Sequence, residues 1–252
     1  MIRLDGKVAI VTGGTGSIGE GIAAAFAHAG AKVIISGRNE PGGRRIAEAL
    51  TAQGGTARFQ PADVSRERDV EALIACACEN FGRLDIAFNA AGVSSLGPLA
   101  DLAEEEFDRV FAINVKGLWL CMKHEIRAML AQGGGGSIIN AASIQSHISV
   151  GGSSHYAASK HAVAAYTRSG AKEYARSGIR VNEIAPGLVN TPLIKPLFEH
   201  NPELREERLK SYPIGRFAEV HDLIGAALFL ASDLSTYING ASLPVDGGYL
   251  VS

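Results

Sequence analysis

The sequence predicts an α/β fold: a single-domain Rossmann-type, doubly wound parallel sheet of about seven strands with helices on both faces. Three observations predict it. Short runs of β-branched residues alternate with longer stretches of helical spacing along the chain. The strand runs are continuously apolar, which is typical of parallel strands covered on both faces. A glycine-rich segment separates the first strand from the first helix, where such folds place a phosphate group.

The elements follow one another with the lengths that this fold requires. The first strand is expected at residues 7–12 (KVAIVT) and the second at residues 32–36 (KVIIS), with a helix at residues 17–29 between them. The next helix, residues 40–53, carries Pro41 in its first turn, where a missing N–H costs no hydrogen bond. The other strands are expected near residues 56–60, 84–88, 137–141, 179–184 and 241–244, and the other helices near residues 66–80, 104–131, 155–176, 202–211 and 219–231.

The alternation of strands and helices runs without a linker, a repeat or a low-complexity segment, so residues 1–252 are interpreted as one domain. Within it, residues 188–212 combine prolines with many charged side chains. That composition predicts a mobile lid over a substrate. The four glycines at 133–136 precede a strand rather than a helix, which indicates a turn and not a phosphate cradle.

Composition narrows the class of partner. The net charge is −2 and no run of Lys or Arg stands out, which argues against nucleic acid and against an anionic membrane. The N-terminus has no apolar signal region, and no apolar stretch is long enough to span a bilayer. The spacing of Cys76, Cys78 and Cys121 favours neither a metal site nor a disulfide. We therefore expect a cytoplasmic protein without a metal that acts on a small molecule.

Residues 12–19 (TGGTGSIG) lie between the first strand and the first helix, where glycines carry phosphate chemistry in a doubly wound sheet. The backbone turns sharply there, and the helix N-terminus offers free N–H groups and a positive dipole to a pyrophosphate. Asp63 ends the third strand, where its carboxylate either accepts the adenine amino group or belongs to the N-cap region of the next helix. After the fourth strand, Asn89-Ala-Ala-Gly92 supplies small residues along which a cofactor can lie.

Tyr156 and Lys160 lie four residues apart at the start of a predicted helix and therefore share one face of it. A nearby ammonium favours the phenolate and lowers the pKa of a phenol, which would make Tyr156 a general acid/base near neutral pH. Ser143 follows a strand and is placed to hold a substrate oxygen. Asn114 lies in an apolar helical setting, where a bare amide needs a partner. The alternative for Tyr156 and Lys160 is the polar face of an amphipathic helix.

Over essentially its whole length the chain resembles the classical short-chain dehydrogenase/reductase family. The resemblance implies hydride transfer between a nicotinamide dinucleotide and a carbonyl or alcohol carbon. It implies that Tyr156 exchanges a proton with the substrate oxygen and that Lys160 binds the nicotinamide ribose and tunes Tyr156. It further implies that Ser143 orients the carbonyl and that Asn114 holds a water linked to Lys160. The matching segments are residues 12–19, Asp63, Asn89-Ala-Ala-Gly92, Asn114, Ser143, Tyr156-x-x-x-Lys160, residues 186–191 (PGLVNT) and residues 245–248 (VDGG).

The end of the second strand bears on which nicotinamide dinucleotide fits. An acidic residue there would bind the ribose 2′-hydroxyl of NAD, but the chain reads Ser36-Gly-Arg38-Asn39. A guanidinium pairs with a phosphate through two parallel hydrogen bonds, so Arg38 favours NADP(H), while NAD stays possible. Arg38 is otherwise an exposed arginine at a helix start, or it stacks on the adenine of NAD. The glycine segment has no second basic residue, which weakens the preference.

The predicted site has three parts. The catalytic candidates are Asn114, Ser143, Tyr156 and Lys160. The cofactor candidates are Gly13, Thr15, Gly16, Ser17, Ile18, Gly19, Arg38, Asp63, Val64, Asn89, Ala90, Gly92, Tyr156, Lys160, Pro186, Gly187, Val189 and Thr191. The substrate candidates are Ser94, Gln145, His147 and Leu188. A sugar or sugar acid is suited by Gln145, His147, Ser153 and Asn190, whereas a cyclic or aliphatic ketone is suited by Leu96, Ile144, Ile148, Leu188, Leu193 and Ile194.

Two residues depart from the family pattern. The glycine segment has Ser17 where the family has a glycine and places its middle glycine at Gly16, a spacing similar to that of epimerases and dehydratases. Ala90 replaces a second asparagine, which we expect to loosen a hydrogen bond in the sheet. The favoured function is the interconversion of a ketone and a secondary alcohol. The alternatives are an epimerase or dehydratase and a regulator that binds the dinucleotide without turnover. The family resemblance also implies a homotetramer.

Overall fold

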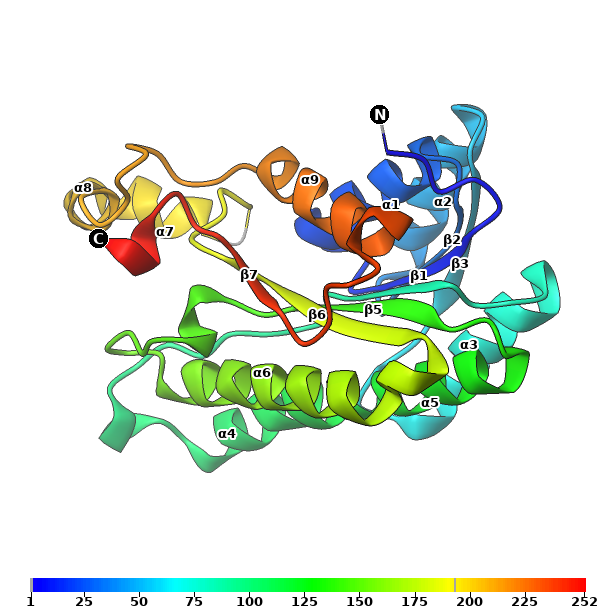
Figure 1. Cartoon of the computed structure of the whole chain (residues 1–252). Helices are drawn as coiled ribbons and strands as arrows, with labels where there is room; N and C mark the ends of the chain where they lie inside the picture. Colours follow the sequence, from blue (N-terminus) through cyan, green and yellow to red (C-terminus); the bar gives the residue numbers. More distant parts are fainter. Residues whose placement is uncertain (1, 193) are drawn as a thin grey trace.

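The chain folds around one parallel sheet. The computed structural model describes residues 2–192 and 194–252. Across these residues seven strands run in the spatial order β3-β2-β1-β4-β5-β6-β7, and every neighbouring pair is parallel (Figure 1). The predicted Rossmann-type sheet is thereby confirmed. In chain order the strands are β1 (Val8–Thr12), β2 (Lys32–Gly37), β3 (Thr56–Pro61), β4 (Ile86–Asn89), β5 (Gly136–Ala141), β6 (Ile179–Pro186) and β7 (Ser242–Val245).

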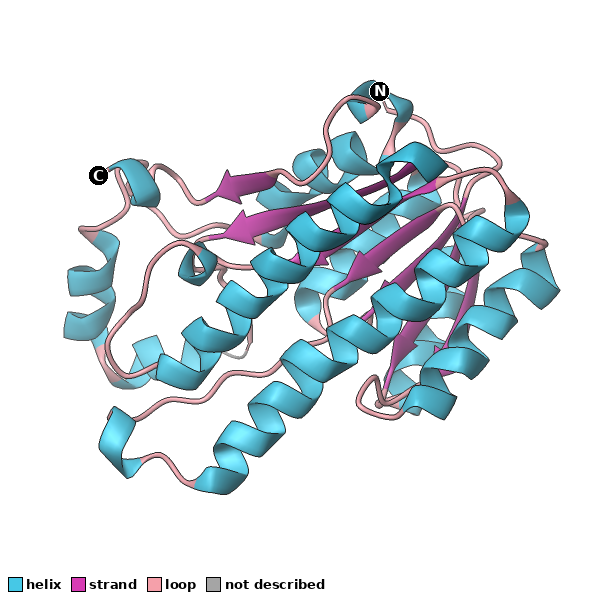
Figure 2. Cartoon of the chain, turned by 60° about the horizontal axis from the view of Figure 1, so that its bottom comes forward, coloured by secondary structure: helices cyan, strands magenta, loops and turns pink. Residues whose placement is uncertain are grey.

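Helices cover both faces of the sheet, as Figures 1 and 2 show. Successive strand residues point to opposite faces, so Ile138 packs with one helical layer and Ile139 with the other. Among the described helices, none combines the length and the apolar composition that a membrane crossing requires. One layer contains α1 (Ser17–His28), α2 (Glu40–Ala52) and α9 (Val220–Ala231), and the other contains α3 (Glu67–Phe81), α4 (Glu104–Phe111), α5 (Leu118–Gln132) and α6 (Ser154–Tyr174).

The order of the strands reverses between β1 and β4, because the chain leaves β3 at one edge and returns to the centre of the sheet. In open parallel sheets, ligands bind in the crevice outside the carboxyl ends of the strands at such a reversal. The loops that follow β1, β2, β3 and β4 all meet at this edge. The topology therefore brings the glycine segment together with Arg38, Asp63 and Gly92.

The helix predicted over residues 104–131 is interrupted in the middle. α4 ends at Phe111, a π-helical segment (η2, Ala112–Gly117) follows, and α5 begins at Leu118. A π-helical turn changes the direction in which its side chains point, and such turns are frequent at functional sites. Here the segment contains Asn114, whose side chain is buried. The sequence did not reveal the interruption because both flanking segments have ordinary helical spacing.

The predicted lid, residues 188–212, contains two short helices where the sequence predicted one. The predicted helix corresponds to α8 (Pro202–Leu209), and the additional helix is α7 (Lys195–His200). A helix this short has little stability of its own and depends on tertiary packing. That packing is visible at Phe198, whose ring stacks on Phe217 with the centroids 5.2 Å apart.

The run of glycines before β5 forms a turn, as predicted. Gly133 ends α5 in the left-handed region of backbone conformation, with φ at 72°. Gly135 has φ at 67°, and a Cβ there would collide with the carbonyl of Gly178. These glycines therefore let the chain leave α5 and enter β5 within a few residues, and they lie at the edge of the sheet opposite the crevice.

Candidate active site

A cavity of about 280 Å³ opens at the crevice beside the carboxyl ends of β1, β2 and β4. Eight of the eighteen cofactor candidates line it, together with six further residues. The predicted lining residues are Gly13, Thr15, Gly16, Arg38, Asp63, Val64, Ala90 and Gly92, and the additional ones are Ser36, Gly37, Ala62, Ala91, Val93 and Ile113. Apart from Ser36, the additional residues are glycine, alanine, valine and isoleucine, which carry no chemical signature in a sequence.

The glycines of residues 12–19 differ in what a side chain would encounter at each position. Gly13 has φ at +64°, and a Cβ there would lie 2.7 Å from the carbonyl of Ala90. A Cβ on Gly19 would collide with the carbonyl oxygen of Gly13. Gly16 has an ordinary φ of −91°, and its Cβ would make only a van der Waals contact of 3.4 Å. The fold therefore requires Gly13 and Gly19, whereas Gly16 keeps free space at the N-terminus of α1.

That N-terminus fits an anionic group. Gly16 is the N-cap residue of α1, and within the described chain no side chain caps the helix there. The first N–H groups of an uncapped helix, together with its dipole, favour a phosphate or carboxylate. The glycine segment departs from the family spacing, but it still offers an uncapped helix N-terminus to an anion. The space beside that N-terminus is provided by Gly16 instead of by a glycine at position 17.

The end of β2 presents one buried hydroxyl and one exposed guanidinium to the cavity. The Ser36 hydroxyl is buried and has no hydrogen-bond partner among the described residues. A buried polar group usually has a partner, so this hydroxyl fits a ligand that occupies the cavity. Gly37 packs against the Thr15 side chain, and Arg38 follows it with its side chain exposed. No acidic residue stands at this position.

Asp63 lies at the turn before α3 and also lines the cavity. Its carboxylate lines the cavity, and Oδ1 accepts hydrogen bonds from Ser65 N at 3.0 Å and Ser65 Oγ at 2.7 Å. Burial alone would raise the pKa of Asp63, but the hydrogen bonds from Ser65 and the charges of Arg66 and Arg38 lower it. The side chain therefore stays ionised at the edge of the cavity while it shapes the turn before α3.

Asn89 does not line the cavity. Its amide points into the interior, where Nδ2 donates to Asn140 Oδ1 at 3.1 Å and to Glu125 Oε2 at 3.0 Å. Asn89 thus supports the sheet from behind, while Ala90 and its neighbours form the cavity surface. The hydrogen bonds of Asn89 join β4 to β5 and to α5.

The catalytic candidates come together where β5, η2 and α6 meet. Lys160 is buried, its Nζ donates to the carbonyl of Ala141 at 2.7 Å, and it lies 5.5 Å from the centroid of the Tyr156 ring. Ser143 follows β5, is also buried, and its Oγ accepts a hydrogen bond from Gln145 N at 3.1 Å. The prediction that Tyr156, Lys160 and Ser143 form one cluster agrees with this geometry.

The pKa of Tyr156 differs from the expectation. Burial raises the pKa of Tyr156 above 10, and a hydrogen bond with Ser143 only partly opposes that effect. Burial lowers the pKa of Lys160 to about 8, opposed by the negative charge of Glu183. The sequence predicted that Lys160 lowers the pKa of Tyr156, and for the free protein this is wrong. Spacing shows that the two side chains share a helix face, but it does not reveal that both are withdrawn from water.

Asn114 ties the loop after β4 to α6. Its Oδ1 accepts from Val93 N and its Nδ2 donates to Val93 O, both at 2.8 Å. Nδ2 also donates to Ser159 Oγ at 3.0 Å, and Ser159 in turn donates to the carbonyl of Tyr156 at 2.7 Å. The amide therefore has the partners that its apolar surroundings demand, and these partners position the first turns of α6.

The segment after β6 is held by a residue that the sequence analysis did not select. Gly187 N donates to Val245 O on β7, and Leu188 N donates to the hydroxyl of Tyr212 at 2.7 Å. Tyr212 is buried, and burial raises its pKa to about 12. Its only signal in the sequence is its position at the end of the predicted lid, which does not reveal a contact across 24 residues.

The substrate candidates separate into two groups. Gln145 lies beside Ser143, and its Oε1 accepts from Ser153 Oγ at 2.7 Å. His147 is exposed and turned toward β7, with Nε2 2.8 Å from Ser242 Oγ. Ser94 is exposed, and Leu188 packs into an apolar cluster formed by Phe198, Tyr212 and Phe217. Leu193, one of the apolar candidates, lies outside the described residues.

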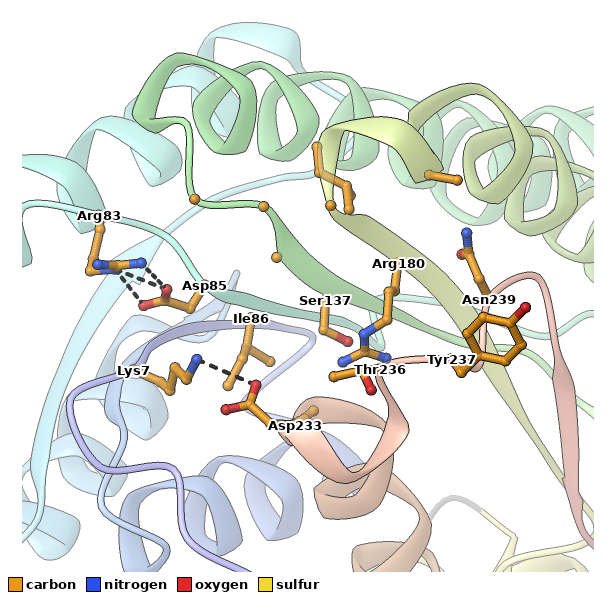
Figure 3. A pocket seen from close by; sticks show the side chains of 17 residues that line it. Lys7, Arg83, Asp85, Ile86, Ser137, Arg180, Asp233, Thr236, Tyr237 and Asn239 are labelled. Carbon is orange, nitrogen blue, oxygen red and sulfur yellow. Dashed lines mark hydrogen bonds and ion pairs between the residues drawn. The ribbon is translucent and has the colours of Figure 1, made fainter.

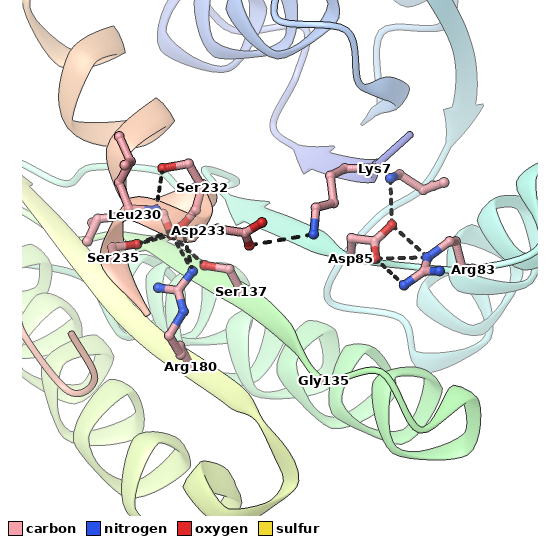
Figure 4. A network of polar contacts seen from close by, with 12 residues as sticks. Lys7, Arg83, Asp85, Gly135, Ser137, Arg180, Leu230, Ser232, Asp233 and Ser235 are labelled. Atoms are coloured by element: carbon pink, nitrogen blue, oxygen red, sulfur yellow. Dashed lines mark hydrogen bonds and ion pairs between the residues drawn. The ribbon is translucent and has the colours of Figure 1, made fainter. Parts of the chain in front are cut away.

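A larger cavity of about 520 Å³ lies at the opposite edge of the sheet (Figure 3). Its cations have partners within the protein, as Figure 4 shows: Lys7 pairs with Asp233 at 3.6 Å and Arg83 with Asp85 at 2.7 Å. Arg180 donates from Nη2 to the carbonyl of Leu230 at 2.9 Å. The catalytic candidates do not line this cavity, and its charges stabilise the junction between β6 and α9.

Comparison with known proteins agrees with this geometry. Residues 13–250 match the family model described as enoyl-(acyl carrier protein) reductase. The chain is 39% identical over 250 residues to 2,5-dichloro-2,5-cyclohexadiene-1,4-diol dehydrogenase of Sphingobium indicum, with 99% of each chain covered. It superimposes on a short-chain type dehydrogenase/reductase from Mycobacterium marinum with a TM-score of 0.93 at 35% identity, covering 100% of this chain and 98% of the other.

A second solved structure carries a cofactor. It is a gluconate 5-dehydrogenase from Burkholderia cenocepacia in complex with NADP and tartrate, 34% identical, with a TM-score of 0.95 and coverage of 100% of this chain and 98% of the other. The matches extend over essentially the whole chain, including the sheet, the glycine segment and residues 143–160. The chain therefore belongs to the classical short-chain dehydrogenase/reductase family and is an oxidoreductase of that family.

Proposed function

We propose that the protein interconverts a ketone and a secondary alcohol with NADP(H) as the preferred cofactor and Tyr156 as the general acid/base. The observation that carries the proposal is the cluster of Ser143, Tyr156 and Lys160 near the crevice at the carboxyl ends of the strands. A cofactor-binding regulator would have no need to retain all three. An epimerase or dehydratase is supported only by the spacing at Gly16, which the structure relates to space at a helix N-terminus.

The residues at the crevice fit a nicotinamide dinucleotide. The N-terminus of α1 and the free space at Gly16 would hold the pyrophosphate, and the Asp63 carboxylate would accept from the adenine amino group. Arg38 and the unpartnered hydroxyl of Ser36 would hold a ribose 2′-phosphate. Residues 186–191 and Lys160 would bind the nicotinamide end. When bound, the nicotinamide supplies or accepts the hydride.

The side chains of this protein manage the proton and the orientation. During reduction the Tyr156 hydroxyl gives its proton to the carbonyl oxygen as hydride reaches the carbon, and during oxidation it takes that proton back. Ser143 donates a hydrogen bond to the same oxygen and fixes its position. The positive charge of Lys160 stabilises the phenolate left on Tyr156 after reduction. Burial of Ser143 and Lys160 keeps water from competing for these contacts.

We propose a small cyclic or polyhydroxylated secondary alcohol as the substrate class. The related dehydrogenases named above act on a cyclic diol and on gluconate. In this chain the side chain of Gln145 uses its carbonyl oxygen for Ser153, which leaves its amide hydrogens as donors near Ser143. A panel of cyclohexanols, cyclic diols, gluconate and the corresponding ketones, each with NADPH or NADP⁺ and with NADH or NAD⁺, tests the proposal. Absence of turnover across this panel would refute it.

Replacing Tyr156 with Phe removes the proton donor and keeps the packing. We expect turnover to fall by at least about 100-fold, the low end for loss of a general acid/base. Cofactor affinity, measured by fluorescence titration with NADPH, should stay close to that of the wild type. Tyr166→Phe, on the same helix and away from the cluster, is the matched control and should keep its activity. Wild-type turnover in Tyr156→Phe would rule out the mechanism.

A further inference from the structure

A row of polar side chains crosses the sheet on the face that α5 and α6 cover. The strand register pairs Asn89 of β4 with Asn140 of β5, and Asn140 with Glu183 of β6. Residues paired in neighbouring parallel strands point to the same face. Asn89 and Asn140 are satisfied: Asn89 donates to Asn140 and Glu125, and Asn140 donates to Thr167 at 2.9 Å. The row therefore brings Glu183 into the same interior layer, one strand further on.

Glu183 is the unsatisfied member of this row. It is 1% exposed, and neither of its carboxylate oxygens has a hydrogen-bond partner among the described residues. The amide of Asn140, its neighbour in register, donates to Thr167 and to the sulfur of Met122 instead. A buried carboxylate without hydrogen bonds is costly unless an opposite charge compensates it.

The buried cation on the covering helix is Lys160. α6 packs directly on β6, and a Cβ on Gly170 of α6 would touch Val181 of β6, which points to the same face as Glu183. The Lys160 ammonium donates to the carbonyl of Ala141, the residue that follows Asn140 on β5. Lys160 is 7% exposed. The ammonium therefore lies against β5, one residue beyond Asn140, and Asn140 is the residue paired in register with Glu183 on β6.

We propose that Glu183 is a positioning residue: its buried carboxylate is the counterion of Lys160 and keeps the ammonium charged and in place beside Tyr156. This inference rests on the proposed function of Lys160 and adds a residue to it. Burial lowers the pKa of Lys160 to about 8, and the negative charge of Glu183 opposes that decrease. Without this charge, less Lys160 would be protonated at neutral pH, and less positive charge would stabilise the Tyr156 phenolate.

Other titratable groups lie on the elements that surround Lys160 and Glu183, and they have hydrogen-bond partners or positions of their own. On α6 the pair is faced by Tyr156. On α5, Glu125 is bonded to Asn89 at the far side of Asn140. On β7, Ser242 is paired in register with Glu183, and its hydroxyl lies 2.8 Å from Nε2 of His147. Glu183 is thus the anion that lies beside Lys160 on the adjoining strand.

The test measures the ionisation of Lys160 directly and by turnover. Glu183→Gln keeps the size of the side chain and removes its charge. In this variant the pH at which the Lys160 ammonium is half deprotonated, its titration midpoint, should fall by about one pH unit or more. It is followed by NMR of the free protein with ¹³C-labelled lysine, with the signal assigned from Lys160→Arg. The alkaline limb of kcat/KM should move to lower pH by the same amount, so activity falls about fivefold at pH 8 and stays near the wild type at pH 6.

Three variants separate a charge effect from a structural one. Glu183→Asp keeps the charge and should keep the midpoint near that of the wild type. Glu183→Met removes the charge with an apolar side chain and should reproduce the shift, even if Glu183→Gln folds poorly. Glu125→Gln, at a buried carboxylate of α5 that is bonded to Asn89, should leave the titration midpoint of Lys160 unchanged.

An unshifted Lys160 midpoint in Glu183→Gln and Glu183→Met would overturn the proposal, even in an enzyme whose Tyr156 chemistry is intact. A shifted midpoint in a protein that shows no ketone reduction would support the pairing while the proposed function failed. The two inferences can therefore fail separately.

Discussion

At the scale of single residues, the site owes its chemistry to burial as much as to residue type. Burial raises the pKa of Tyr156 and lowers that of Lys160 to about 8. In the free protein, loss of contact with water therefore disfavours both the Tyr156 phenolate and the Lys160 ammonium. A hydrogen bond with Ser143 partly opposes the increase in the pKa of Tyr156, and the charge of Glu183 partly opposes the decrease in the pKa of Lys160. The same physical cause acts on Glu125, whose pKa burial raises to about 7. The active site and the polar row behind it thus share an interior in which each charge needs a partner.

Glu125 should make the stability of the protein pH-dependent. Its pKa is raised above the unfolded value of 4.5, so the stability it confers is fully present below that pH and is lost as pH rises through about 7. A shift of this size corresponds to about 3 kcal/mol. Urea unfolding at pH 5 and pH 8 should show a smaller difference in Glu125→Gln than in the wild type. Equal pH dependence in both proteins would contradict a raised pKa of Glu125.

Arg38 should decide the choice of cofactor. Arg38→Asp places a negative charge where a 2′-phosphate would lie, so kcat/KM with NADPH should fall at least tenfold more than kcat/KM with NADH. Arg45→Asp, a change of an exposed arginine on α2 that does not line the cavity, is the control. A wild-type enzyme that favours NADH tenfold would show that Arg38 does not bind a 2′-phosphate.

At the scale of elements, the lid packs through a small apolar cluster that includes Phe217, which lies beyond the lid in the chain. Phe198, Tyr212 and Phe217 are buried together, while most of the charged side chains of α8 are exposed. So few buried contacts give a segment that opens more easily than the sheet. In the free protein, backbone amides of α7 and α8 should exchange with deuterium faster than those of β4 and β5. Equal protection of the lid and the sheet would rule out a mobile lid.

Tyr212 should connect this lid to the residues that bind the cofactor. In Tyr212→Phe the partly buried Leu188 amide loses its acceptor, which costs about 1 kcal/mol, the low end for an unsatisfied donor. We expect faster exchange of the Leu188 amide and a higher KM for the cofactor. Tyr237→Phe, at a fully exposed tyrosine, is the control and should change neither. Unchanged exchange at Leu188 would show that the Tyr212 hydroxyl does not hold this segment.

At the scale of the whole molecule, the face formed by α4, α5 and α6 supports the tetramer that the family resemblance implied. Phe107 and Trp119 are about two-fifths exposed there, and the small residues Ala158 and Ala165 are exposed on α6. Light scattering at micromolar concentration should give four times the mass of the 26.4 kDa chain. Trp119→Glu should lower the measured mass, because it puts a charge into a buried contact. A monomeric wild type would refute the assembly.

The sequence by itself determined the sheet, the order of its elements along the chain and the cluster of Ser143, Tyr156 and Lys160. It could do so because these depend on local patterns: apolar strand runs, helical periodicity, glycines at a strand–helix turn, and Tyr156 one helical turn before Lys160. These signals are carried by neighbours in the chain, and the sheet topology then brings their ends to one edge.

Tertiary structure alone decided the features that depend on distant residues and on exclusion of water. At the π-helical turn, the Asn114 side-chain amide forms hydrogen bonds with Val93 and Ser159. The short helix α7 is stabilised by the packing of Phe198 on Phe217. Asn89 faces the interior rather than the cofactor crevice, and Glu183 lies behind Lys160, because strand register sets which residues share a face. The directions of the pKa shifts at Tyr156 and Lys160 follow from burial, a property of the packed molecule that spacing along the chain does not encode.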